Sequence, residues 1–144
     1  LSMLRKMKVK RIIGRAINSM HQSILSELGI EEITHPEEDI ATELAAMLML
    51  KDALSTMVVS DQYIIAEIKI PKTYVGHSLA AVNLESRFGI KAVALKIAPE
   101  EKGLGVLFNK DYRVDMSCDP ARLFREKDRL IVIGPLEGIK RFVE

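Results

Sequence analysis

Hydrophobic positions in the first half of the chain alternate between the spacings typical of strands and of helices. A short β-rich run over residues 9–16 precedes a helical pattern over residues 18–29, which is closed by Gly29. A second short run over residues 30–35 precedes a longer helical pattern that begins at Pro36. This order of strand, helix, strand and helix predicts the last units of an open parallel α/β sheet.

The second of these helical patterns, over residues 37–54, is apolar around most of its circumference. Its first turn carries three carboxylates, which favour the positive end of a helix dipole, and alanine, leucine and methionine dominate the rest. A helix with so little polar surface is expected to be buried on more than one side. Two interpretations stay open: the helix packs inside its own domain, or it forms a contact between subunits, for which adaptable methionines are suited.

The periodicity lapses at residues 55–62, where small polar residues gather, and this predicts a domain boundary. Residues 1–57 and 61–144 are the expected domains. Strands and helices then mix without regular alternation, which indicates a small α+β domain after the α/β part. Its expected elements are a strand at 63–71, a helix at 74–90, a strand at 90–97, a loop at 98–105, a strand or hairpin at 106–116, a helical turn at 119–124, a solvated turn at 125–128, a strand at 129–134 and a helix at 135–144.

Composition and charge exclude several classes of protein. The 21 basic and 20 acidic residues nearly cancel, so no long-range field favours nucleic acid or an anionic membrane. Cys118 is the only cysteine, which rules out an internal disulfide and fits a reducing, cytoplasmic compartment. The most apolar run, residues 41–50, is too short to cross a bilayer. Because a helical pattern is already under way at Leu1, we expect further sequence before it.

Few residues form a pattern typical of catalysis or metal binding. His35 with the carboxylates at 37–39 could hold a metal, but the first turn of a helix explains those carboxylates. Neither Cys118 nor any serine is grouped with histidine in a nucleophile motif, and Gly103 and Gly105 lack the strand and helix of a phosphate-binding turn. We therefore expect no enzyme and no catalytic or metal site; a small enzyme with an unrecognised site is the contrasting class.

The ordered set of motifs resembles a known family, although no single motif is diagnostic. In the first half these are VKRIIGRA and LSELGIEEITHPEEDIATELA. In the second half the matching residues are Gly76, Ser78, Leu79, Leu84, Arg87, Phe88, Gly89, Ile90, the run AVAL, Pro120, Asp128, the run LIVIG and Phe142. Over nearly its whole length the chain resembles the cytosolic regulators of potassium conductance, the Ktr- and Trk-type regulatory subunits of bacterial potassium uptake.

This resemblance implies a domain organisation, partners and a location. Residues 1–57 would be the end of a Rossmann-like nucleotide-binding domain with a crossover helix, and residues 61–144 a C-terminal regulatory domain that binds an effector and dimerises. The glycine-rich turn for NAD or ATP would lie upstream of residue 1, so no cofactor is expected in this chain itself. The implied partners are further copies of the chain, as a homodimer or higher homo-oligomer, and a membrane potassium channel subunit that holds it at the inner face of the cell membrane; no nucleic acid is implied.

The resemblance also implies an effector site. In such regulators the helix between two glycines belongs to a domain that pairs with its twin, and in many members the cleft between twins accepts cyclic di-AMP. The apolar walls of such a cleft could pack against adenine rings, while cationic side chains bind the phosphates. The candidate residues are His77, Arg87, Ala92, Val93, Ala94 and Lys96, with Lys96 as a point charge on phosphate. Strand residues of this kind are more often simply core, since a branched apolar strand face needs no ligand to explain it. A regulatory domain of another cation transporter or antiporter is the alternative function.

Overall fold

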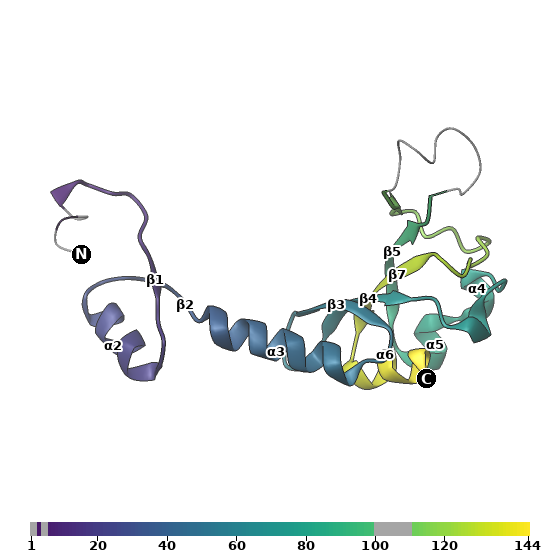
Figure 1. The fold of residues 1–144 in the computed structure, drawn as a ribbon, viewed down its shortest axis with the longest axis horizontal. Coiled ribbons are helices and arrows are strands. Elements are labelled where there is room, and N and C mark those ends of the chain that lie inside the picture. The colour runs from purple at the N-terminus through teal and green to yellow at the C-terminus, as the bar shows by residue number, and fades with distance from the viewer. Residues whose placement is uncertain (1–2, 4–5, 100–110) are drawn as a thin grey trace. The chain divides into compact units, whose positions relative to one another are not determined.

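The computed structural model describes residue 3, residues 6–99 and residues 111–144 (Figure 1). The chain forms two compact units, Leu1–Thr42 and Glu43–Glu144. Most of the loop predicted at 98–105, with Gly103 and Gly105, lies outside the described residues. The assignment of residues 1–57 and 61–144 to a nucleotide-binding and a regulatory domain stays a prediction.

A small parallel sheet forms the first unit together with its helices. Gly14 in β1 pairs with Ile33 in β2, so the predicted parallel arrangement is confirmed. Asn18 begins the first helix because its side-chain oxygen accepts a hydrogen bond from the backbone N–H of His21 at 2.8 Å. Gly29 ends the same segment with a left-handed backbone, φ 76°. The elements are β1 (Ile13–Arg15), α2 (Ser19–Glu27), β2 (Glu32–Thr34) and the start of α3 (Pro36–Met49).

The long apolar helix ends earlier than the sequence pattern predicts. α3 stops at Met49, and β3 (Ala53–Val58) pairs antiparallel with β4 (Ile64–Lys69), where a helix end and a domain boundary were predicted. The predicted helix end at residue 54 was wrong, because Asp52 takes a left-handed φ of 62° and the β-branched residues that follow suit a strand. The domain boundary at 55–62 stays a prediction. Burial of α3 on several sides is not seen either: among its described residues only Ala46 is buried.

Five antiparallel strands make the sheet of the second unit, in the order β3-β4-β7-β5-β6 among the described residues. β7 lies at its centre, hydrogen-bonded to β4 on one side and β5 on the other. The strands predicted near 63–71, 90–97 and 129–134 are confirmed as β4, β5 (Lys91–Ile97) and β7 (Arg129–Gly134). β6 (Arg113–Asp115) falls within the predicted 106–116 strand, whose residues 106–110 lie outside the described residues. Together the two units give a mixed α/β protein.

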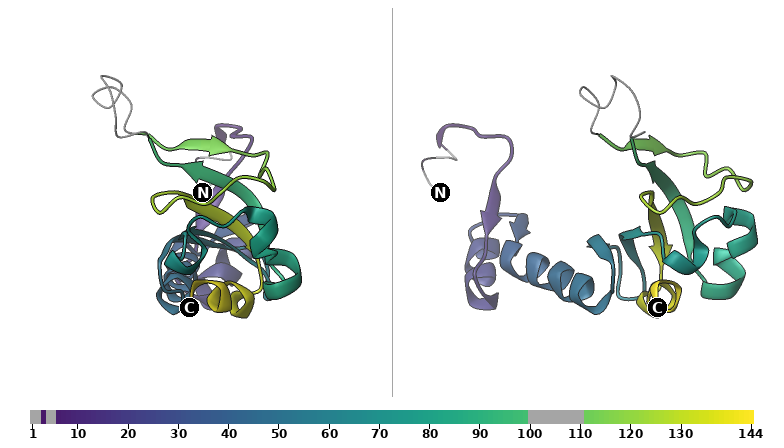
Figure 2. Two further views of the ribbon diagram at one scale, coloured as in Figure 1. Left: turned by 90° about the vertical axis from the view of Figure 1, so that its right-hand side faces the viewer. Right: turned by 45° about the vertical axis from the view of Figure 1, so that its right-hand side comes forward.

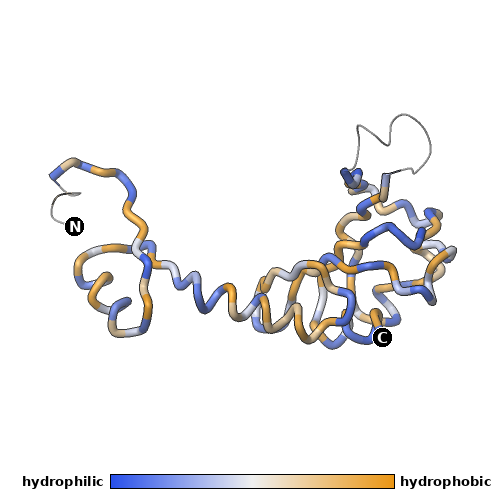
Figure 3. Tube along the Cα trace, in the orientation of Figure 1, coloured by the Kyte–Doolittle hydropathy of each residue, from blue (hydrophilic) through white to orange (hydrophobic). Residues whose placement is uncertain are grey.

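The core of the second unit lies on one face of this sheet. Along β4 and β7 buried and half-buried residues alternate, and the buried set shares one apolar cluster with residues of three helices. Figure 2 shows the ribbon of this unit, and Figure 3 colours its trace by hydropathy. Those helices are α4 (Leu79–Val82), α5 (Leu84–Phe88) and α6 (Leu136–Val143), and α5 contacts α6. On the sheet's opposite face, Glu67, Lys96 and Arg129 are only half-buried.

The helix predicted over residues 74–90 is broken into shorter pieces. A 3₁₀ turn, η1 (Lys72–Tyr74), comes first, and Asn83 separates α4 from α5 with a left-handed φ of 50°. Ser78 caps α4, its hydroxyl accepting from the N–H of Ala81 at 3.1 Å. The helical turn predicted at 119–124 is instead an extended segment after a tight turn, in which Leu123 bridges to Ser78.

Candidate functional site

A cavity of about 270 Å³ lies beside the break between α4 and α5 and the start of β5. We call it the α4–β5 hollow. Its wall is mainly apolar, and a few polar groups stand among the apolar ones, as is usual for ligand sites. The lining residues are Leu79, Ala80, Asn83, Leu84, Glu85, Ile90, Lys91, Ala92, Cys118 and Pro120.

Backbone hydrogen bonds hold the walls of the α4–β5 hollow together. The N–H of Ala80 donates to the carbonyl of Pro120 at 2.9 Å, and the N–H of Leu79 donates to the carbonyl of Arg122 at 3.1 Å. The left-handed turn at Asn83 lets α5 follow α4 at once, so both helices contribute to one wall. The hollow is therefore built by the fold before any ligand arrives, which reduces the ordering cost of binding.

The polar groups of the hollow suit binding and not nucleophilic chemistry. Lys91 Nζ lies 3.4 Å from Glu85 Oε1, and both side chains are about 70% exposed. Burial raises the pKa of the Cys118 thiol, and the charge of Asp115 adds to this rise. A thiol with a raised pKa stays protonated at neutral pH and is a poor nucleophile. The arrangement can hold an apolar body against its wall and one anionic group beside Lys91.

A β-bulge in β5 separates the strand residues that the sequence grouped as one site. Ala92 lines the hollow and pairs with the fully buried Val132, whereas Ala94 pairs with the half-buried Ile131. Because the register shifts between Ala92 and Ala94, the two alanines point to opposite faces of the sheet. Lys96 shares the face of Ala94, away from the hollow.

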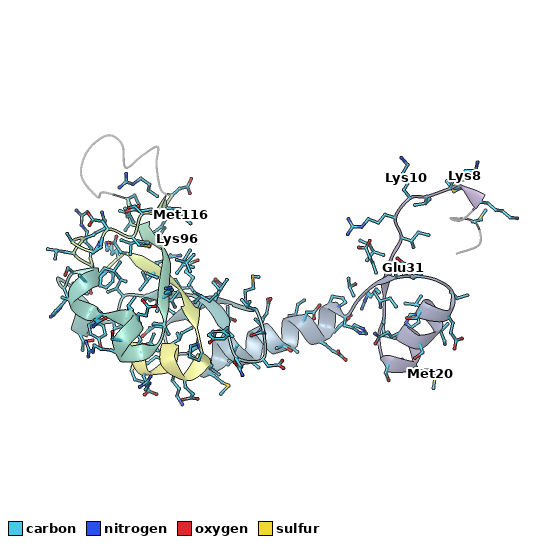
Figure 4. The ribbon with its side chains drawn as sticks, turned by 180° about the vertical axis from the view of Figure 1, so that it is seen from behind. Lys8, Lys10, Met20, Glu31, Lys96 and Met116 are labelled. Carbon is cyan, nitrogen blue, oxygen red and sulfur yellow. The ribbon has the colours of Figure 1, made fainter. Side chains whose placement is uncertain are left out.

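Lys96, labelled in Figure 4, lies on the sheet of the second unit. It already forms an ion pair with a carboxylate of β4. Its ammonium donates to Glu67 Oε2 at 2.6 Å, and Arg129 donates to Glu67 Oε1 at 3.0 Å. Arg129 also lies over the ring of Tyr112, 4.0 Å from its centroid. Partial burial tends to raise the pKa of Glu67, but the hydrogen bonds from Lys96 and Arg129 outweigh it and leave the pKa below its usual value. The charge of Lys96 thus stabilises the sheet.

We expect Glu67→Gln to make the protein less stable at neutral pH and less sensitive to acid. A carboxylate whose pKa is lower in the folded state stabilises that state above its unfolded pKa, about 4.3, and the stabilisation is lost as the pH falls through the folded pKa. The free energy of unfolding at pH 7 should drop by about 1–2 kcal/mol. Urea titrations between pH 3 and pH 7 would measure it, with the exposed Glu126→Gln as control. Parallel pH profiles for Glu67→Gln and the unaltered chain would contradict it.

The other predicted site residues lie apart from the hollow. Arg87 is exposed, with its guanidinium 5.0 Å from the ring centroid of Phe88, and its Nη1 donates to the carbonyl of Val82 at 3.4 Å. His77 is exposed too, in the turn after η1, and Val93 is half-buried within the bulge of β5. Because the hypothesis places the ligand between two copies, these positions in one chain do not test it. The six-residue site stays a prediction.

Sequence reasoning missed most of the residues that line the hollow. Asn83 gave a usable signal, because asparagine inside a helical pattern tolerates a left-handed backbone better than most residues. Glu85 and Lys91 lie in or next to the segment that resembles the family, but neither is one of the matching residues. Nothing in the sequence indicated that Cys118 and Pro120 pack beside Ala80, since that contact depends on the tertiary fold.

The described residues contain no group of three or more side chains suited to a metal ion. His35 precedes the first turn of α3, where Glu37 forms an ion pair with Arg15. No helix within the described part of the chain is both long and apolar enough to cross a membrane.

Two potassium uptake proteins of Bacillus subtilis (strain 168) are similar to this chain along nearly all of it. Ktr system potassium uptake protein C is 28% identical over 139 residues, which cover 96% of this chain and 57% of the relative. Ktr system potassium uptake protein A is 26% identical over 140 residues, 97% of this chain and 57% of the relative. The chain thus spans little more than half the length of these curated relatives. The predicted resemblance to Ktr-type proteins is confirmed, although no family model matches.

Solved structures with related descriptions match less closely. The crystal structure of the GsuK RCK domain gives a TM-score of 0.44 at 14% identity, over 92% of this chain and 27% of that one. The C domain of the potassium transport protein KtrA, solved in complex with cyclic diadenosine monophosphate, gives a TM-score of 0.44 at 23% identity, over 58% and 82%. The functional conclusion therefore depends on the sequence relatives and on the geometry of the chain itself.

Proposed function

We propose that this chain is a non-catalytic regulatory part of a bacterial potassium-uptake system. The similarity to two Ktr proteins along 96% and 97% of the chain carries the proposal. In this role the chain acts at the cytoplasmic side of the membrane, binds a small effector and biases a membrane potassium channel subunit. An effector can shift such a gate only by its different affinity for two states, typically about 1–3 kcal/mol.

The effector we propose is a small nucleotide such as cyclic di-AMP, held in the α4–β5 hollow. Leu79, Ala80 and Ala92 offer an apolar wall for an adenine ring, and Lys91 offers a cation for a phosphate. At about 270 Å³ the hollow falls just short of the usual range for pockets of drug-sized ligands, roughly 300 to 1,000 Å³. One chain would therefore hold only part of the ligand, and a second copy would supply the rest across a two-fold axis.

This proposal places the cation for the phosphate at Lys91 instead of Lys96. Lys96 is committed to Glu67 at 2.6 Å, whereas the contact of Lys91 with Glu85 is longer, at 3.4 Å, and exposed. An exposed ion pair is weak and readily exchanged for a phosphate contact. Glu85 itself opposes an anion, so the hollow should bind a phosphate less tightly than it would without that carboxylate.

A homodimeric contact through α3 belongs to the same proposal. Ile40, Leu44 and Leu48 follow one another at a spacing of four, and their exposed fractions are 64%, 47% and 76%. Apolar residues at this spacing form one stripe along a helix. A matching stripe on a second copy would cover it, in line with the interpretation of this helix as a subunit contact.

Titration calorimetry with the 144-residue chain would test the proposal, using cyclic di-AMP with ATP and NAD as controls. We expect heat for cyclic di-AMP with one dinucleotide per two chains. Alkylation of Cys118, the only cysteine, should slow in the bound state because that side chain lines the hollow. No heat with any of the three ligands, in a sample shown to be dimeric, would remove nucleotide binding from the proposal.

We expect Lys91→Gln to weaken cyclic di-AMP binding by about 10-fold, because a charge-assisted contact to phosphate contributes about 1.5–3 kcal/mol before exposure weakens it. Glu85→Gln should strengthen binding a few-fold by removing a like charge. Lys96→Gln is the matched control, since it removes the same charge on the other face of the sheet. Dissociation constants from calorimetry would decide between the two sites. A larger loss of affinity for Lys96→Gln than for Lys91→Gln would favour the predicted six-residue site over the hollow.

A further inference from the structure

A second cavity in the second unit shares no lining residue with the α4–β5 hollow. It is an open groove of about 640 Å³ between the turn after η1 and the segment that leads to β7. We call it the 75–126 groove. Its lining residues are Val75, Gly76, Arg122, Leu123, Phe124, Arg125 and Glu126.

Short backbone hydrogen bonds fix the two walls of this groove. The N–H of Gly76 donates to the carbonyl of Phe124 at 2.8 Å, and the N–H of Phe124 donates to the carbonyl of His77 at 2.9 Å. Next to them, Ser78 and Leu123 form an antiparallel bridge. Because both walls belong to one hydrogen-bonded ladder, the groove exists without a ligand, and little ordering would be needed for one to bind.

Arg122 is the unusual side chain of the groove. Within the described residues its Nε is buried and has no hydrogen-bond partner, although the side chain as a whole is 22% exposed. Its Nη2 lies 3.6 Å from Asp128 Oδ2, which is an ion pair but too long for a hydrogen bond. A guanidinium carries five N–H donors, and a buried polar group without a partner in a native protein calls for a water, an ion or a ligand.

The charge and the apolar surface of the groove indicate which ligand fits. The lining contains two arginines and one glutamate, and Val75, Leu123 and Phe124 supply apolar wall. Leu123 is 57% exposed, so apolar surface is available to a ligand. Arginine donates in a planar fork that matches carboxylate and phosphate oxygens. We propose that the 75–126 groove is a second ligand site, which takes a small organic molecule bearing a carboxylate or phosphate on an apolar body.

The competing explanation is that Arg122 has a purely structural role and serves only to pair with Asp128. Asp128 is fully buried and also accepts from the backbone N–H of Ala98 at 3.0 Å and of Arg125 at 3.4 Å. The ion pair with Asp128 occupies one end of the guanidinium and leaves its Nε unused.

The proposed site does not depend on whether the α4–β5 hollow binds a nucleotide.

Nuclear magnetic resonance of the ¹⁵N-labelled chain would test this proposal with benzoate, phenyl phosphate and the neutral benzamide. We expect benzoate and phenyl phosphate to shift the amides of Gly76, Leu123 and Arg125 and the Nε–H of Arg122, with saturation. Benzamide should bind at least about 5-fold more weakly, because it lacks the charge that the arginines recognise. Sodium chloride at matched ionic strength controls for screening.

Arg125→Gln should weaken benzoate binding about 5-fold and leave the rest of the spectrum unchanged, since the side chain is exposed. Arg113→Gln, an exposed arginine on β6 outside the groove, is the matched control and should have no effect. Arg122→Lys keeps the charge but loses the fork, and it should weaken benzoate more than benzamide. Equal affinity for benzoate and benzamide, or shifts confined to residues of the α4–β5 hollow, would overturn the proposal.

Discussion

Replacing Gly138 with alanine should destabilise the second unit by about 3 kcal/mol or more. A Cβ built at this position would lie 2.2 Å from the carbonyl oxygen of Phe88 and 3.0 Å from Cγ2 of Ile90. The first of these is a backbone atom at the end of α5, so no side-chain rotation can relieve the clash. Overpacking of this kind typically costs about 1–3 kcal/mol, and more where the backbone must shift.

Destabilisation by Gly138→Ala would be informative, because helix propensity alone predicts that the change stabilises the protein. Gly138 lies inside α6, where alanine in place of glycine ordinarily favours the helix by about 1 kcal/mol. Guanidinium denaturation followed by circular dichroism would measure the difference. Gly76→Ala is the control: its Cβ would meet nothing within 4 Å, and only the left-handed φ of 83° opposes it, at about 1–2 kcal/mol. A Gly138→Ala chain as stable as the unaltered one would contradict the close approach of α6 to α5.

Regular alternation and strong periodicity made the central strands and the last helix predictable. β4 alternates buried and half-buried residues, and α6 places Ile139, Phe142 and Val143 on one buried face. The parallel pairing of β1 and β2 followed from the strand–helix–strand order, since a helical crossover joins parallel strands. In these places local propensity and tertiary packing agree, so one sequence pattern was enough.

Predictions failed where tertiary contacts override the local pattern. No strand was predicted directly after α3, because periodicity lapses there and small polar residues gather, yet pairing with β4 makes Ala53–Val58 a strand. The bulge in β5 turns Ala92 and Ala94 to opposite faces, and nothing in an alternating run reveals a one-residue shift of register. The same shift places Ala92 at the hollow and Ala94 on the other face, while the six-residue effector site between two copies stays a prediction. The hollow itself joins two segments that are far apart in sequence, Leu79 to Ala92 and Cys118 to Pro120.

Asp128 shows most clearly how tertiary contacts override a local pattern. It was predicted to lie in a solvated turn, yet it is the only buried charged residue among those described. We expect Asp128→Ala to lower the free energy of unfolding by about 3–5 kcal/mol, the usual cost of breaking a buried ion pair from one side. The change removes the acceptor for the N–H groups of Ala98 and Arg125 and leaves Arg122 without its ion pair. Urea denaturation at neutral pH would measure the loss.

Two further variants separate the charge of Asp128 from its hydrogen bonds. Asp128→Asn keeps one oxygen for a backbone N–H but removes the charge that pairs with Arg122, so its loss should fall between zero and that of Asp128→Ala. Asp119→Ala makes the same chemical change at an exposed carboxylate, which accepts from the N–H of Ala121 at 2.9 Å, and should cost about 1 kcal/mol. Equal losses for Asp119→Ala and Asp128→Ala would mean that Asp128 does not anchor the segment between the hollow and the groove. If the larger loss is found, this carboxylate fixes one wall of both cavities, because residues 118–126 line the two of them and Asp128 holds that segment to the end of β5.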